Sequence, residues 1–142
     1  MADVVIIGGG TAGLTAAIYL QRNAAQCTLL EGDVFGGRIF ASLSVENYPG
    51  MPGISGEEYS EKLCAQARAL GAELVQNPAV ALARDGALWR ITTSDGTLEA
   101  PAVILATGER RRVLNIPGEV EFTGRGVSSC AACDTVSFLS LT

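Results

Sequence analysis

The feature that most restricts the fold of this chain is a glycine-rich turn with the pattern G-x-G-x-x-G at residues 8–13. A short apolar run rich in β-branched residues, Val4–Ile7, precedes the turn and is typical of a strand buried on both faces. Apolar residues with helical spacing follow from Thr11 to about Asn23, and a second apolar run follows at 27–31. Strand, tight turn, helix and strand predict a βαβ unit with parallel strands and a right-handed crossover.

Within such a unit the glycine pattern predicts a dinucleotide-binding turn. Gly8 permits the tight turn, Gly10 lets the backbone approach a pyrophosphate, and Gly13 allows the helix to pack closely on the strand. Thr11 and Ala12 open the helix, where free N–H groups and the positive end of the helix dipole favour phosphate.

An acidic residue, Glu31, ends the second predicted strand. Its distance from the glycine turn is close to the spacing of about twenty residues typical of a ribose-binding acid. The carboxylate would accept hydrogen bonds from a ribose 2′-hydroxyl and repel a 2′-phosphate, which favours FAD or NAD over NADP. The alternative is a glycine-rich turn followed by a surface glutamate.

The remaining pattern predicts a long loop, a helix, a set of short strands and a final strand. Residues 32–56 are rich in Gly, Pro, Ser and Asn, and a loop of this length without regular structure is usually functional. The other predicted elements are a helix over Glu57–Leu70 with Gly71 as its C′ residue, strands at 74–75, 80–83 and 88–93 joined by hairpin turns at 84–86 and 94–96, and a fully buried strand over 102–106.

Composition excludes several classes of function. The 142 residues are 48% hydrophobic and 18% charged, which indicates a packed domain rather than a disordered chain. A net charge of -5 disfavours nucleic-acid binding, and the absence of histidine excludes Ser-His triads and histidine metal sites. With neither a basic secretory start nor a long apolar stretch, we expect a soluble, cytoplasmic protein without a membrane segment.

The four cysteines fall into two groups. Cys27 and Cys64 lie inside predicted regular structure, and we expect them to be small core residues. Cys130 and Cys133 form a C-x-x-C pattern, which favours a low thiolate pKa and a reversible disulfide. Zinc binding would need a second such pair or histidines, so no metal site is expected; two unpaired core thiols are the other alternative.

Four stretches in a fixed order carry a resemblance to a known family. They are residues 8–17 (GGGTAGLTAA), 46–50 (ENYPG), 106–108 (ATG) and 126–134 (GVSSCAACD). In this order and spacing, over about residues 3–134, the chain resembles the N-terminal part of the low-molecular-weight, bacterial-type thioredoxin reductases. These are pyridine nucleotide-disulfide oxidoreductases with FAD/NAD(P)-binding domains.

The resemblance implies the fold and the domain organisation. It implies an α/β protein with a Rossmann-like parallel sheet in a three-layer ββα arrangement and an inserted antiparallel β-meander. Residues 1–113 would be the N-terminal part of the FAD-binding domain, and 114–142 a linker and the start of the nicotinamide/disulfide domain. The full-length family would be homodimeric.

The resemblance also implies which residues contact FAD. Contacts are expected from the glycine turn and Glu31, from Gly36, Gly37 and Arg38 along the cofactor, from Asn47 facing the flavin, and from Thr107 and Gly108 near the phosphates. Arg38 departs from the glutamine that is common in this family. The basic run 110–112 is expected to be a solvated turn, and a docking role is the alternative.

The same resemblance implies the redox chemistry. Cys133 would face the flavin, Cys130 would exchange with the disulfide of thioredoxin, and Asp134 would donate and accept the proton. Electrons would pass from NADPH through FAD and the cysteine pair to thioredoxin.

The sequence after Asp134 departs from the family pattern. Neither the second dinucleotide fingerprint, which would bind NADPH, nor the segment that completes the FAD domain follows, so we expect a truncated chain that binds FAD weakly and has no NADPH turnover alone. Two other interpretations stay open. One is a related FAD reductase with a different partner, in a peroxide-reducing or ferredoxin-fed system; the other is a non-catalytic FAD-binding remnant.

Overall fold

The computed structural model describes residues 2–110, 112–128 and 130. The chain divides into two compact units, Met1–Gly108 and Glu109–Thr142, which are treated separately below. Their boundary lies a few residues before the predicted end of the FAD-binding domain at residue 113, and that functional assignment stays a prediction.

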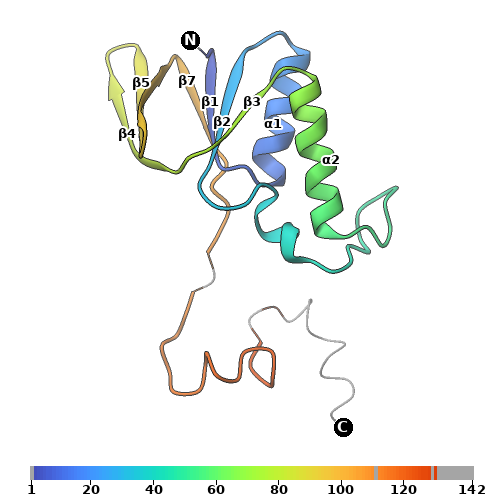
Figure 1. Ribbon diagram of the computed structural model, residues 1–142. Helices are drawn as coiled ribbons and strands as arrows, with labels where there is room; N and C mark the ends of the chain where they lie inside the picture. Colours follow the sequence, from blue (N-terminus) through green and yellow to red (C-terminus); the bar gives the residue numbers. More distant parts are fainter. Residues whose placement is uncertain (1, 111, 129, 131–142) are drawn as a thin grey trace. The chain divides into compact units, whose positions relative to one another are not determined.

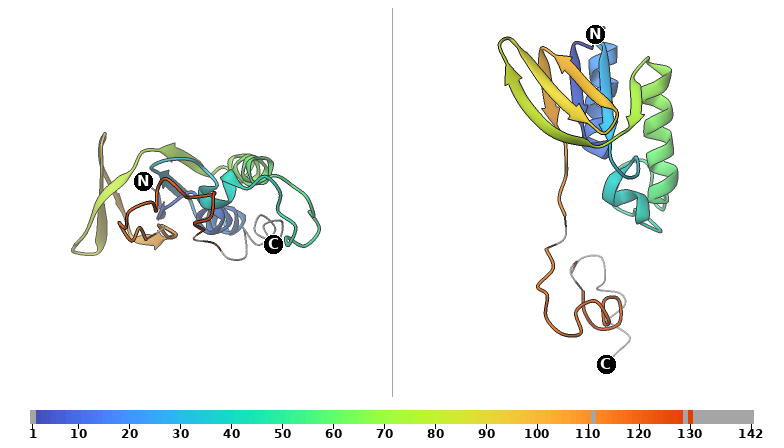
Figure 2. Two further views of the ribbon diagram at one scale, coloured as in Figure 1. Left: turned by 90° about the horizontal axis from the view of Figure 1, so that it is seen from below. Right: turned by 60° about the vertical axis from the view of Figure 1, so that its left-hand side comes forward.

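A four-stranded parallel sheet in the order β3-β2-β1-β7 forms the middle layer of the first unit (Figure 1). Two α-helices cover one face of this sheet, and an antiparallel sheet in the order β4-β5-β6 covers the other (Figures 1 and 2). The predicted α/β fold with a Rossmann-like sheet and an inserted meander is therefore confirmed. The elements in chain order are β1 (Val4–Ile7), α1 (Thr11–Arg22), β2 (Cys27–Glu31), the 3-10 helix η1 (Gly37–Ala41), α2 (Gly56–Ala69), β3 (Glu73–Gln76), β4 (Ala79–Asp85), β5 (Leu88–Thr93), β6 (Gly96–Ala100) and β7 (Ala102–Leu105).

Alternation along the central strands gives the unit two apolar cores. Ile6 and Leu29 face the helices, while Val5 and Leu30 face the meander, and all four are at most 2% exposed. This is the burial on both faces that the apolar runs of β1 and β2 predict.

The two cysteines of the first unit are buried, as expected. Cys27 and Cys64 both lie in the core between sheet and helices and are free thiols. Burial raises the pKa of each thiol above its ordinary value, so both stay protonated at neutral pH.

The prediction of a fully buried last strand is wrong. β7 lies at the edge of the parallel sheet, and within the described residues it pairs only with β1. The Leu105 side chain is 65% exposed. An apolar run predicts a strand that could be buried in a sheet interior. Whether that strand lies in the interior or at the edge depends on which strands pair with it.

The predicted long loop is partly ordered. η1 occupies part of it, and an antiparallel bridge joins Val45 to Ile54. The helix α2 starts one residue earlier than expected, at Gly56, because the Ser55 hydroxyl caps it by accepting a hydrogen bond from the Glu58 N–H at 3.1 Å. Gly71 follows the helix with φ +99°, as predicted for a C′ residue.

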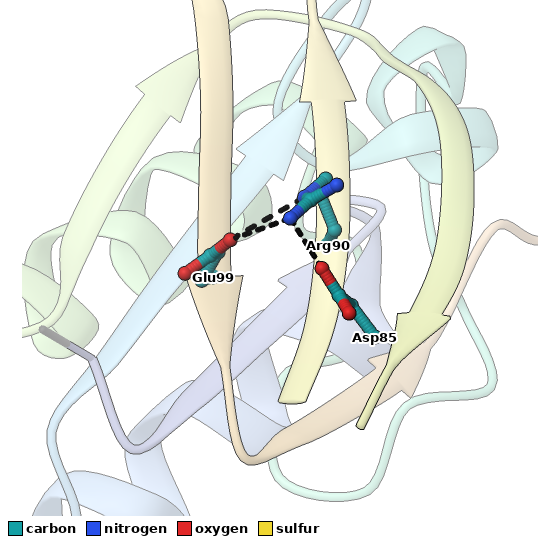
Figure 3. Close-up of polar contacts among 3 residues, drawn as sticks. All are labelled: Asp85, Arg90 and Glu99. Atoms are coloured by element: carbon teal, nitrogen blue, oxygen red, sulfur yellow. Dashed lines mark hydrogen bonds and ion pairs between the residues drawn. The ribbon is translucent and has the colours of Figure 1, made fainter. Parts of the chain in front are cut away.

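The outer face of the meander carries an ion-pair network (Figure 3). Arg90 on β5 pairs with Asp85 at the end of β4 and with Glu99 on β6, the latter at 3.3 Å. All three side chains are about half exposed, so the network contributes little to stability.

Two kinds of site are not found in the described part of the chain. None of its helices has the length and apolar character needed to cross a membrane. None of its Cys, Asp and Glu side chains form a group of three or more that could hold a metal ion.

Candidate functional site

The glycine turn lies where β1 meets α1, and two of its glycines are required by packing. Gly8 has φ +108°, and a Cβ there would lie 2.3 Å from the Ala106 carbonyl oxygen. A Cβ on Gly13 would lie 1.8 Å from the Gly8 carbonyl oxygen. The turn therefore tolerates no side chain at either position, because α1 packs directly on the turn and β7 ends beside it.

Gly10 differs from these two glycines. Its backbone is extended, with φ -71° and ψ -176°, and a Cβ would meet only the Gly36 carbonyl oxygen, at 3.8 Å. Neither conformation nor internal packing thus demands glycine here. Gly10 is the N-cap of α1 and offers no side chain to its first N–H groups. Apart from the two chain neighbours of Gly10 and the Gly36 carbonyl oxygen, no atom of the described chain lies within 4 Å of that Cβ position, so glycine here leaves the backbone N–H groups accessible, as a pyrophosphate would require.

Glu31 is held against this turn by two backbone donors. Its Oε2 accepts a hydrogen bond from the Gly9 N–H at 2.5 Å, and its Oε1 accepts one from the Asp33 N–H at 2.9 Å. Sequence reasoning missed this contact between Glu31 and the turn. Because a carboxylate has about four acceptor positions, the group retains capacity for ribose hydroxyls.

A second glycine pair lies beside the turn. The Gly36 N–H donates to the Gly9 carbonyl oxygen at 2.8 Å, and a Cβ on Gly37 would lie 3.3 Å from the Gly10 Cα. Gly36 and Gly37 both have positive φ, at +106° and +62°. Arg38 follows on η1 with an exposed side chain.

The remaining predicted contacts of the first unit lie on two other segments. Thr107 follows β7 and lies close to Gly8, since a Cβ on Gly8 would be 3.1 Å from the Thr107 Cα. Gly108 is exposed, with φ +66°. Asn47 is exposed in the loop between Val45 and Ile54. The structure thus brings the glycine turn, Glu31, the second glycine pair and Thr107 together, while Asn47 belongs to a loop attached to α2.

The predicted redox residues belong to the second unit. Cys130 is half-buried, its sulfur is in a disulfide bond, and its N–H donates to the Ser128 hydroxyl at 3.1 Å. Cys133 and Asp134 lie outside the described residues. In the basic run 110–112, the first and last arginines are exposed, as expected of a solvated turn, and the middle one is not described.

Comparison with known proteins gives the family. The model described as "Pyridine nucleotide-disulphide oxidoreductase" matches residues 2–141. The chain belongs to this family.

Several pyridine nucleotide-disulphide oxidoreductases resemble it over nearly its whole length. The thioredoxin reductase of Treponema pallidum is 44% identical over 133 residues, which are 93% of this chain and 43% of that protein. That of Mycolicibacterium smegmatis is 43% identical over 96% of this chain and 44% of its own length. The crystal structure of Lactococcus lactis thioredoxin reductase in its FR conformation superposes with a TM-score of 0.81 at 42% identity, over 94% of this chain and 44% of that one. The chain therefore spans less than half the length of these relatives.

One further contact beside the glycine turn was missed by sequence reasoning. A Cβ on Gly56 would lie 1.6 Å from the Ile39 carbonyl oxygen, and one on Gly36 would lie 2.0 Å from the buried Ser60 hydroxyl oxygen. The start of α2 therefore packs directly on the segment that carries the second glycine pair. The available signal was the spacing of Gly56 and Ser60, two small residues one helical turn apart.

Proposed function

We propose that this chain supplies the FAD-binding part and the dithiol of a thioredoxin reductase. In the whole protein, NADPH would be the electron donor, and thioredoxin or a similar protein disulfide would be the acceptor. The observation that carries the proposal is the open space at Gly10, which lies beside Glu31 and the second glycine pair although nothing in the fold requires glycine there. The alignment to two thioredoxin reductases, at 44% and 43% identity over more than nine-tenths of this chain, supports the choice of reaction.

The first unit would bind the cofactor through its backbone. The N–H groups at the start of α1 would receive the pyrophosphate, with Thr11 and Ala12 in the first helical turn. Glu31, fixed by the Gly9 and Asp33 N–H groups, would accept the ribose hydroxyls. Its negative charge would exclude a 2′-phosphate, which favours FAD over a phosphorylated dinucleotide at this site.

Three further segments would complete the FAD contacts. Gly36, Gly37 and Arg38 would lie along the cofactor, and Thr107 and Gly108 near its phosphates. Asn47 would face the flavin. Gly36 and Gly37 lie close to Gly10, which supports contact of this segment with FAD.

The second unit would supply the dithiol. Bound FAD would supply the electron transfer between the nicotinamide and the disulfide. Cys130 would attack the disulfide of the protein substrate, Cys133 would face the flavin, and Asp134 would hold and return the proton. The disulfide bond at Cys130 supports a redox role for this cysteine. A homodimeric state and a cytoplasmic location stay predictions.

Titration of the purified chain with FAD tests the proposal directly. FAD should bind, with a change in flavin fluorescence, and NADP⁺ should not compete. Gly10→Ala should weaken FAD binding at least about tenfold, or about 1.4 kcal/mol, without changing the far-UV circular dichroism. Equal FAD affinity of the two chains would contradict the assignment of the pyrophosphate to this turn.

Thiol counting tests the second half of the proposal. Oxidation should remove two accessible thiols, and Cys130→Ser should leave a single one that no longer closes. The buried Cys27 and Cys64 should react only after unfolding. A chain in which Cys130 stays a free thiol under mild oxidation would not be a disulfide reductase.

A further inference from the structure

We propose that Tyr59 on α2 is a positioning residue, which holds the loop between Val45 and Ile54 so that Asn47 stays at the flavin end of the cofactor. The inference rests on the proposed FAD binding and adds to it a residue that no sequence motif identified.

The base of this loop is fixed by backbone hydrogen bonds. The Val45 N–H donates to the Ile54 carbonyl oxygen at 2.8 Å, and the Gly53 N–H donates back to the Val45 carbonyl oxygen at 3.1 Å. Just below the bridge, the Gly56 N–H donates to the Ser42 carbonyl oxygen at 2.8 Å. These hydrogen bonds hold both ends of the loop beside the first turn of α2.

Tyr59 contacts both the base and the outer part of the loop. Its side chain is 5% exposed and packs in one apolar cluster with Val45 and Ile54. Its ring centroid lies 4.8 Å from that of Tyr48 at an interplanar angle of 54°, an ordinary tilted aromatic pair. Tyr48 directly follows Asn47, so the ring contact restrains the backbone beside the amide.

The rest of the loop would otherwise allow considerable freedom. Gly50 and Gly53 have φ of +82° and +77°, and a Cβ on either would meet nothing within 4 Å. The tip is thus unsupported by packing at these two positions, and glycine permits several alternative conformations. The Tyr48–Tyr59 ring pair ties the outer part of the loop to the helix.

The environment of Tyr59 suits a fixed anchor. Burial, followed by the hydrogen bond and the charge of Tyr48, raises the pKa of Tyr59 to about 12. The phenol therefore stays neutral over the working pH range.

The experiment compares cofactor fragments in matched variants. Tyr59→Leu keeps an apolar side chain on a helix but removes the ring contact, while Tyr59→Phe keeps the ring contact and loses only the hydrogen bond with Tyr48. Tyr19→Leu is the control for loss of a helical tyrosine, because Tyr19 is 60% exposed on α1. Affinities for FAD and for ADP are measured by titration, together with hydrogen exchange of the loop amides in the chain without cofactor.

A positioning role predicts a selective effect. Tyr59→Leu should weaken FAD about five- to tenfold and leave ADP unchanged, because the glycine turn and Glu31 lie on other segments. Tyr59→Phe and Tyr19→Leu should bind both as the unchanged chain does. The loop amides should exchange faster only in Tyr59→Leu, and in an Asn47→Ala background Tyr59→Leu should have no further effect on FAD.

The contrary outcomes separate this inference from the proposed function. Equal weakening of FAD and ADP by Tyr59→Leu would make Tyr59 an ordinary core residue and overturn the inference, with FAD binding intact. Additive effects of Tyr59→Leu and Asn47→Ala, or unchanged exchange of the loop amides, would overturn it as well. Failure of the unchanged chain to bind either FAD or ADP would overturn the proposed function, and the inference with it.

Discussion

Replacing Gly13 with alanine tests whether the close packing of helix α1 on the glycine turn is required for stability. The added methyl carbon would lie 1.8 Å from the Gly8 carbonyl oxygen and 3.4 Å from the Ile6 Cγ2. The nearer atom belongs to the backbone and cannot rotate away, so α1 and the turn must separate by about 1.5 Å to reach an ordinary contact.

Two opposite effects set the size of the change. Alanine is favoured over glycine inside a helix by about 1 kcal/mol. Inserting a methyl group into a tightly packed contact costs about 1–3 kcal/mol and sometimes more, and a rigid backbone neighbour places this case at the upper end. We therefore expect Gly13→Ala to lower the free energy of unfolding by about 2 kcal/mol, the upper-end packing cost less the gain in helix propensity.

Urea unfolding measures this change, followed by far-UV circular dichroism and by the fluorescence of Trp89, the only tryptophan. Gly10→Ala is the matched control. Its backbone angles are open to alanine and its Cβ has space, so its unfolding free energy should stay within about 1 kcal/mol of the unchanged chain. A Gly13→Ala chain as stable as the original, or stabilised by its helix propensity, would refute the packing argument.

Three further predictions concern single side chains. Ser55→Ala removes the cap that accepts from the Glu58 N–H, and should lower the unfolding free energy by about 1 kcal/mol in a urea titration. Asn77→Ala should cost about 2 kcal/mol in the same assay, because this amide is 6% exposed and loses its hydrogen bonds to Thr93, Ser94 and Asp95. Arg90→Met on the exposed meander face should cost less than about 1 kcal/mol (Figure 3). The folded-state pKa of Tyr59 is raised to about 12, above the ordinary value of 10.0, so the neutral phenol contributes fully to the free energy of unfolding below pH 10, and this contribution is lost as the pH rises through 12. Tyr59→Phe should therefore reduce the fall of the unfolding free energy between pH 10 and 12. Identical plots of unfolding free energy against pH for the two chains would contradict the raised pKa.

The βαβ unit could be predicted because its causes are local. A Cβ on Gly13 would meet the Gly8 carbonyl oxygen within the turn itself, and the apolar runs of β1 and β2 are each contained in a few consecutive residues. The contact of Gly8 with the end of β7, and the groups that bury the two strands, come from distant segments. The hairpins of the meander and the end of α2 at Gly71 follow in the same way from turn residues with positive φ.

The features that escaped prediction depend on contacts between distant segments. The exposure of Leu105 depends on the place of β7 in the sheet, which no run of residues encodes. The hydrogen bond from Gly9 to Glu31 and the ring contact of Tyr48 with Tyr59 join segments whose relative placement only the folded chain determines. For the site, sequence predicts which groups would meet a dinucleotide, and this stays a prediction, but it does not predict which groups hold them in place.

The pairing of β1 with β7 has a consequence for the way this protein is synthesised. Val4 pairs with Ala102, so nearly the whole first unit must emerge from the ribosome before the sheet can close. β2 can pair with β1 early, but the other edge of β1 stays open throughout the translation of α2 and the meander. Such long-range closure slows folding, and until it is complete the unpaired edge of β1 is open to pairing with other chains.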